Sequence, residues 1–195
     1  MNITEIDKPI IINNILHTFD NVKILDYLFA NGKFEIGADD QDPKTKIKNV
    51  LSNEVNHAGF YYAPKNESNN FGVLNCPLTM YGFVITNQIC KNLEFTYSKI
   101  IRIAYNYYCR HQFAGEHTDS KEDNTISIIY NPITTDGGTI ILGQKYQDIG
   151  SQAKVFNSKW LHSSYSTDKD KARVSLNIVL ALQVVKNNNA VLTYL

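Results

Sequence analysis

The chain has 195 residues, enough for a single domain that buries a core without disulfides or a structural metal. Its nineteen basic residues balance nineteen acidic ones and like charges form no block, so neither nucleic acid nor a membrane is an expected partner. No apolar run is long enough for a signal sequence or a membrane span. The three cysteines form no Cys-x-x-Cys pair, which is typical of free thiols in a reducing compartment, so we expect a cytoplasmic protein.

The first 98 residues predict a mixture of strand and helix. The β-branched run from Ile10 to Leu16 predicts a strand. Asp20 is expected to cap a helix that carries apolar residues at helical spacing and ends at Asn31-Gly32. A second helix is expected from Leu78 to Leu93, although Gly82 is a weak helix former. Further expectations are loops at 37–48 and 64–75, a short helix at 47–55 and a short extended piece at 60–62.

From Lys99 onward the pattern changes to short strands separated by turn residues, such as those at 131–132 and 136–138. This pattern is typical of a β-sandwich or jelly roll and not of a parallel α/β sheet. We therefore expect one mainly β domain over residues 1–195, with a helical and strand support (1–98), a jelly-roll core (99–182) and a C-terminal tail (183–195). The strands are expected at 100–109, 125–130, 139–142, 145–149, 154–156, 163–166 and 173–182.

The last strand, from Arg173 to Leu182, alternates between two kinds of side chain. One face is wholly apolar and needs a cover, which the N-terminal helices are expected to supply. The other face begins with Arg173, Ser175 and Asn177. If this face points into the barrel, the buried guanidinium needs an anion, and its planar fork suits a carboxylate. The alternative is an exposed Arg173 at the start of the strand, beside Lys169 and Lys171.

A candidate metal site begins at His117-Thr118-Asp119. In an extended segment, residues two apart point to the same face, so this imidazole and this carboxylate leave the backbone side by side. His162 is a third candidate ligand further along the chain. Two histidines and one carboxylate suit Fe(II) with open coordination positions. Taken alone, His-x-Asp is a weak signal, since two polar residues in a surface turn explain it more often than a metal site does.

The order and spacing of these residues resemble the Fe(II)- and 2-oxoglutarate-dependent oxygenases. In that family a His-x-Asp, a distal His and an Arg or Lys about ten residues further lie on a double-stranded β-helix, a cupin-like jelly roll. Here 42 residues separate Asp119 from His162, and ten separate His162 from Arg173. The resemblance covers roughly Lys99 to Leu182. The turn at 136–139 and the segment 154–162 are similar to those of small prolyl-hydroxylase-like and phage-encoded members.

The resemblance implies a role for each matching residue. His117, Asp119 and His162 would bind Fe(II), while Arg173 would pair with the distal carboxylate of 2-oxoglutarate. The other residues implied at the 2-oxoglutarate end are Ser175, Tyr108 and Asn106. The implied co-substrates are 2-oxoglutarate and O₂, with ascorbate as a candidate reductant, and the implied products are succinate and CO₂. The substrate to be hydroxylated would be a small molecule or a protein side chain.

Departures from the family pattern narrow the range of expected reactions and substrates. The nucleic-acid demethylating branch has a second Arg six residues after the first, where this chain has Val179, and an acidic residue where this chain has Lys121. The presence of Asp119 disfavours the halogenase variant. Collagen-type prolyl hydroxylases usually carry Lys where Arg173 stands, so a peptidyl-proline substrate does not follow. Two alternatives stay open: a non-catalytic jelly-roll module that binds a metal or a sugar, and an oxidase that does not use 2-oxoglutarate.

Overall fold

The computed structural model describes residues 6–31, 61–62, 77–165, 167–170 and 172–183. The loops expected at 37–48 and 64–75 and the short helix expected at 47–55 lie outside these residues, as does nearly all of the expected C-terminal tail. Within the described ranges no helix combines the length and the apolar character needed to cross a bilayer.

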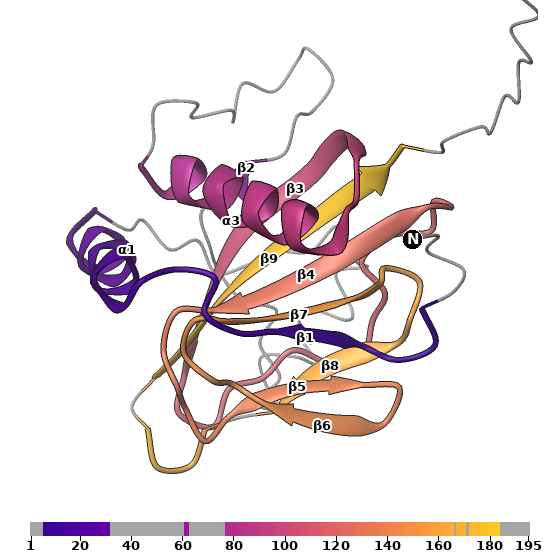
Figure 1. The fold of residues 1–195 in the computed structure, drawn as a ribbon. Helices are drawn as coiled ribbons and strands as arrows, with labels where there is room; N and C mark the ends of the chain where they lie inside the picture. Colours follow the sequence, from indigo (N-terminus) through magenta and orange to yellow (C-terminus); the bar gives the residue numbers. More distant parts are fainter. Residues whose placement is uncertain (1–5, 32–60, 63–76, 166, 171, 184–195) are drawn as a thin grey trace, which may run out of the picture.

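The described residues form two antiparallel sheets, a large one and a small one (Figure 1). Ile129 and Phe156 of the large sheet pack against Ile141 of the small sheet, so the two sheets share a buried interior. This arrangement confirms the predicted β-sandwich or jelly-roll class. In spatial order the large sheet consists of β1 (Ile10–Ile12), β7 (Gln152–Asn157), β4 (Thr125–Asn131), β9 (Ala172–Leu182), β3 (Tyr97–Cys109) and β2 (Tyr61–Tyr62). The small sheet consists of β6 (Gln144–Gln147), β5 (Gly138–Ile141) and β8 (His162–Tyr165).

The seven strands expected after residue 99 are all present, with ends shifted by up to three residues. The expected strand at 10–16 is shorter and stops at Ile12, and the expected extended piece at 60–62 is the edge strand β2. The longest pairing joins β3 to β9, where Tyr108 lies opposite Arg173 and Asn106 opposite Ser175. Because opposite residues of an antiparallel pair point to the same face, these four side chains belong to one surface of the sheet.

In the part of the chain that the structure describes, two helices precede the main strands: α1 (Thr18–Asn31) and α3 (Pro77–Leu93). The second matches the helix expected at 78–93. The prediction that Asp20 caps the first helix is wrong, because the backbone amides of Asp20 and Asn21 already donate to the His17 carbonyl. Asp20 instead lies in the first helical turn. A carboxylate there interacts favourably with the positive end of the helix dipole.

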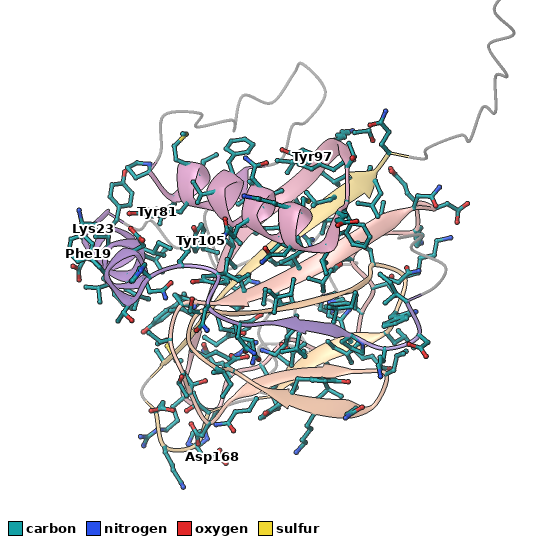
Figure 2. The ribbon with its side chains drawn as sticks, in the orientation of Figure 1. Phe19, Lys23, Tyr81, Tyr97, Tyr105 and Asp168 are labelled. Atoms are coloured by element: carbon teal, nitrogen blue, oxygen red, sulfur yellow. The ribbon has the colours of Figure 1, made fainter. Side chains whose placement is uncertain are left out.

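The helices cover the outer face of the large sheet, as expected from the apolar side of the last strand. Figure 1 shows α3 lying across β3 and β9. Figure 2 shows Tyr105 of β3 between the sheet and α3, and its hydroxyl donates to the Leu78 carbonyl over 3.0 Å. The buried cluster joins residues of β9 with residues of both helices: Val174, Leu176, Ile178, Leu180, Ile24, Leu28, Ile85 and Ile89.

Gly82 has a packing reason to be in the middle of α3. A Cβ atom at this position would lie 2.7 Å from Cγ2 of Ile103, a buried residue of β3. That distance is too short for two carbon atoms in contact. The residue that lowers helix propensity therefore allows the helix to approach the sheet closely.

The two cysteines in the described part of the chain are free thiols, as expected. Burial raises the pKa of Cys90 to about 11, so its thiol stays protonated and unreactive at neutral pH. Cys109 is exposed at the end of β3.

Replacing Gly82 with Ala should destabilise the protein by about 1 kcal/mol. Helix propensity alone predicts a gain of about 1 kcal/mol, but overpacking against Ile103 costs roughly 1 to 3 kcal/mol. Urea denaturation of Gly82→Ala and of Val84→Ala, on the exposed side of the same helix, measures the difference. A stabilised Gly82→Ala variant would show that the contact with Ile103 relaxes freely.

Candidate active site

Backbone pairing fixes the His-x-Asp segment against β8. The amide of His117 donates to the carbonyl of His162 and the amide of His162 donates back, each over 2.9 Å. Three residues earlier, Ala114 forms the same kind of exchange with Ser164, through its carbonyl and through the Ser164 hydroxyl. These bonds bring His162 beside His117 although many residues separate them in the sequence.

The three predicted metal ligands converge. One ligand atom from each of His117, Asp119 and His162 lies within 4.8 Å of the others. Nε2 of His162 lies 3.4 Å from Oδ2 of Asp119, and Nε2 of His117 lies 3.8 Å from Oδ1. The side chains of Asp119 and His162 are 0% and 3% exposed, whereas that of His117 is 34% exposed, so the cluster opens on the His117 side.

The imidazole rings are oriented with Nε2 toward the cluster. Nδ1 of His117 lies 2.7 Å from the Gly115 carbonyl, and Nδ1 of His162 lies 3.0 Å from the Trp160 carbonyl. A carbonyl only accepts, so each Nδ1 carries the proton and each Nε2 keeps a lone pair for a metal. Nε2 of His162 is buried and has no hydrogen-bond partner. A divalent ion at this position would satisfy that atom, so the residues fit a metal.

Asp119 is held by side chains from three strands. The Ser127 hydroxyl of β4 donates to Oδ2 over 2.6 Å, and the Asn177 amide of β9 donates to Oδ1 over 3.1 Å. The Arg102 guanidinium of β3 forms an ion pair with Oδ1. Burial raises the pKa of Asp119, but Arg102 and the two imidazoles outweigh burial and hold this pKa well below its ordinary value. Asp119 is therefore an ionised carboxylate held in a fixed orientation.

The histidine pKa values shift in opposite directions. Burial lowers the pKa of His117, and the neighbouring His162 lowers it further. Burial also lowers the pKa of His162, but the Asp119 carboxylate reverses this effect, and the net shift is upward. Before a metal binds, His162 therefore binds a proton more tightly than His117 does.

Arg173 lies deep inside the barrel and is 2% exposed, so the alternative of an exposed Arg173 is wrong. Its Nε donates to Oδ2 of Asp148 over 2.5 Å, and its Nη2 donates to the Thr139 hydroxyl over 3.1 Å. The Tyr108 ring lies against the guanidinium, with 5.1 Å between the ring centroid and Cζ. The predicted neighbour Tyr108 is thus beside Arg173, as their cross-strand pairing requires.

A second buried cation, which the sequence analysis did not single out, completes this pocket. Lys154 of β7 is 0% exposed, and its Nζ donates to Oδ1 of Asp148 over 3.0 Å and to Oδ1 of Asn131 over 2.6 Å. Two cations against one carboxylate leave one positive charge inside the barrel. Nδ2 of Asn131 is also buried without a partner. A buried excess charge is costly, so this pocket favours an incoming anion.

The two clusters lie along one strand face. On β9, the side chains of Arg173, Ser175 and Asn177 point inward, and the Asn177 amide donates to Asp119, a predicted metal ligand. The four residue steps from Arg173 to Asn177 span roughly 13 Å at the rise of an antiparallel strand. Ser175 is buried and its cross-strand partner Asn106 is partly buried between the clusters. The arrangement suits a ligand with a chelating group at one end and an anionic group at the other.

Several site residues were missed because nothing in their local sequence marks them. Ser127, Asp148 and Lys154 are single polar residues within predicted strands. Arg102 had a usable signal: the alternation that places Asn106 and Tyr108 on one face of β3 extends back to it. His111 lies outside the cluster, is exposed, and faces Asp168 at the other end of the barrel.

No protein-family model matches the sequence, and no curated protein matches it. Solved structures do match the fold. A prolyl hydroxylase from Trichoplax adhaerens, in complex with a hypoxia-inducible-factor peptide fragment, aligns over 90% of this chain and 84% of its own, with TM-score 0.61 and 12% identity. A 2OG-Fe(II) oxygenase-family oxidoreductase from Burkholderia pseudomallei aligns over 89% and 84%, with TM-score 0.58 and 13% identity.

A prolyl-4-hydroxylase from Pseudomonas putida aligns over 90% of this chain and 92% of its own, with TM-score 0.56 and 10% identity. These similarities run over nearly the whole length of each protein, and the shared architecture is the double-stranded β-helix. The chain therefore has the fold of the 2-oxoglutarate- and Fe(II)-dependent oxygenases, as its sequence motifs imply.

Proposed function

We propose that this chain is an Fe(II)- and 2-oxoglutarate-dependent dioxygenase that hydroxylates a small molecule or a protein side chain. The proposal depends on one observation. Three candidate ligands for a metal ion and a buried cationic pocket lie on the same inner face of the sheet. Neither cluster alone would indicate this reaction. The fold similarity to known oxygenases supports the same reading.

The donor set fits an ion that keeps open positions. His117, Asp119 and His162 would hold Fe(II) by two nitrogens and one oxygen, which leaves room at an octahedral ion for an oxoacid and O₂. Bound Fe(II) would supply the coupling of O₂ reduction to decarboxylation of 2-oxoglutarate, giving succinate and CO₂. The contribution of Ser127 and Asn177 is to fix the Asp119 carboxylate, so that its orientation does not depend on the ion.

The cationic pocket would bind the far carboxylate of 2-oxoglutarate. Arg173 and Lys154 supply two positive charges, and Asp148 neutralises one of them while holding both side chains in place. The Tyr108 ring covers one side of the guanidinium. Ser175 and Asn106 lie along the path between this pocket and the metal ligands, where they would contact the middle of the oxoacid.

The buried side of the His162 ring is apolar. The Phe156 ring meets the His162 ring edge-on, with centroids 4.9 Å apart, and Phe156 is fully buried. This contact excludes water from the inner side of His162. The exposed edge of His117 is therefore the side from which a substrate would approach.

The compartment and the partners stay predictions. Free thiols at Cys90 and Cys109 are consistent with the expected cytoplasmic location. The balanced net charge gives no reason to infer a nucleic-acid or membrane partner. Ascorbate is inferred only as a reductant that would restore Fe(II).

Metal binding should weaken as the pH falls. A proton on Nε2 of His162 excludes a metal, and because the pKa of His162 is raised, the affinity should drop about tenfold per pH unit below that pKa. Electron paramagnetic resonance of free Mn(II) measures this slope under anaerobic conditions. His162→Ala should lose binding, whereas the exposed control His111→Ala should bind normally. Equal affinity in His162→Ala would remove His162 from the ligand set.

Anaerobic Fe(II) and 2-oxoglutarate should give a weak visible charge-transfer band, and addition of O₂ should yield succinate even without a substrate. Arg173→Gln should raise the 2-oxoglutarate concentration required at least tenfold, because a charge-assisted pair is lost, while Mn(II) affinity is retained. Lys99→Gln, at the exposed start of β3, is the control. A colourless mixture that forms no succinate would instead favour a binding module.

The excess charge of the cationic pocket can be tested by a pair of variants. Lys154→Met leaves Arg173 and Asp148 as a neutral pair, so 2-oxoglutarate affinity should fall about tenfold or more. The double variant Lys154→Met with Asp148→Asn restores one positive charge and should recover much of that loss. Titration of the charge-transfer band gives both affinities, and thermal unfolding checks that each variant folds. Equal affinities in the single and double variants would contradict the role of net charge.

A further inference from the structure

We propose that Arg102 is the substrate-binding residue of this site and that it binds a carboxylate of the primary substrate next to the metal. This inference rests on the proposed function and adds the chemical class of the substrate to it. It follows from the position of Arg102, from its unused hydrogen-bond donors and from the balance of charges in the loaded site.

Arg102 lies at the open side of the metal cluster. Its side chain is 30% exposed, close to the 34% of His117, whereas Asp119 is fully buried. Arg102 and Arg173 lie at opposite ends of the inner face formed by β3 and β9, because Arg102 pairs with Val179 and Tyr108 pairs with Arg173. A substrate that reaches the metal from solvent therefore passes Arg102, while the Arg173 pocket lies on the far side.

The guanidinium of Arg102 has donors to spare. Its Nη2 is paired with Oδ1 of Asp119, but its Nε is buried without a hydrogen-bond partner. An arginine carries five N–H donors in a planar fork, so a single carboxylate oxygen does not satisfy it. A buried N–H without an acceptor is unfavourable. An incoming acceptor at this edge would relieve it.

The charges of the loaded site leave Arg102 without a counter-ion. A divalent ion with Asp119 leaves one positive charge, and the Arg173, Lys154 and Asp148 cluster leaves another. The two carboxylates of 2-oxoglutarate neutralise these two charges. The negative charge of Asp119 is then already matched by the ion. The positive charge of Arg102 at the entrance is therefore left without a partner.

A carboxylate matches this surplus better than the other common anions. It is a planar monoanion whose two oxygens suit the guanidinium fork. A phosphate monoester carries nearly two negative charges at neutral pH and would overcompensate a surplus of one. The site therefore assigns the substrate a carboxylate close to the carbon that is oxidised.

Paramagnetic relaxation in the protein loaded with Mn(II) and N-oxalylglycine tests the proposal. N-oxalylglycine would occupy the 2-oxoglutarate position without reacting. Any relaxation of a second ligand then reports binding at a different position near the metal. The probes are cyclohexanecarboxylate and the isosteric, neutral cyclohexanecarboxamide. The ring protons of the carboxylate should relax faster than those of the amide. The carboxylate should also bind about tenfold more tightly, as expected for a charge-assisted pair.

Variants of Arg102 separate substrate binding from support of Asp119. In Arg102→Gln the ratio of the carboxylate affinity to the carboxamide affinity should fall to about one. Arg102→Lys should keep most of this preference, because a positive charge remains. The preference is a ratio within each variant, so any change in metal affinity cancels. Lys99→Gln, on the same strand, is the control.

Each outcome has a definite meaning. Equal binding of the two probes, no binding of either, or an unchanged preference in Arg102→Gln overturns the assignment of Arg102. Failure of N-oxalylglycine to bind the Mn(II) protein instead overturns the proposed function. The two failures are distinguished because the N-oxalylglycine titration precedes addition of either probe.

Discussion

The alternation of side chains along β9 is the constraint on which the site depends. This strand lies between β3 and β4, and its outward residues are buried under α1 and α3. With the outer face committed to the core, Arg173, Ser175 and Asn177 have to point inward. A shift of one residue in register would exchange the two faces, exposing the apolar set and removing both ends of the site at once. The register that buries the core is thus also the register that assembles the site.

The charged side chains of the inner face occur in groups of two or three. An isolated buried charge would destabilise the fold, because it loses its hydration. Asp119 is matched by Arg102, and Asp148 is matched by both Lys154 and Arg173. Each group is tied to a different strand, so the charges also fix how strands of the two sheets face one another. The arrangement is preorganised, because each charged side chain is already held by a charged partner.

The sequence was most informative where a few residues act at fixed spacing. His117, Asp119 and His162 and the distant Arg173 could be singled out because their residue types are limited by chemistry, and alternation was enough to place Arg173 inside. Arg102, Asp148 and Lys154 could not be assigned partners, because these contacts depend on the register between strands distant in the sequence. The start of α1 was misplaced because a backbone carbonyl at His17 accepts the first bonds and no side-chain cap marks it.

The backbone hydrogen bonds between His117 and His162 also affect how far the sequence can change while the fold is kept. Any residue except proline can supply an amide and a carbonyl, so the bonds that align the two segments place little demand on the surrounding side chains. Mutations around them can accumulate while the spacing of the two imidazoles is inherited unchanged. A framework held in this way tolerates nearly complete replacement of its sequence, in keeping with proteins that share 10 to 13% of their residues and the same architecture.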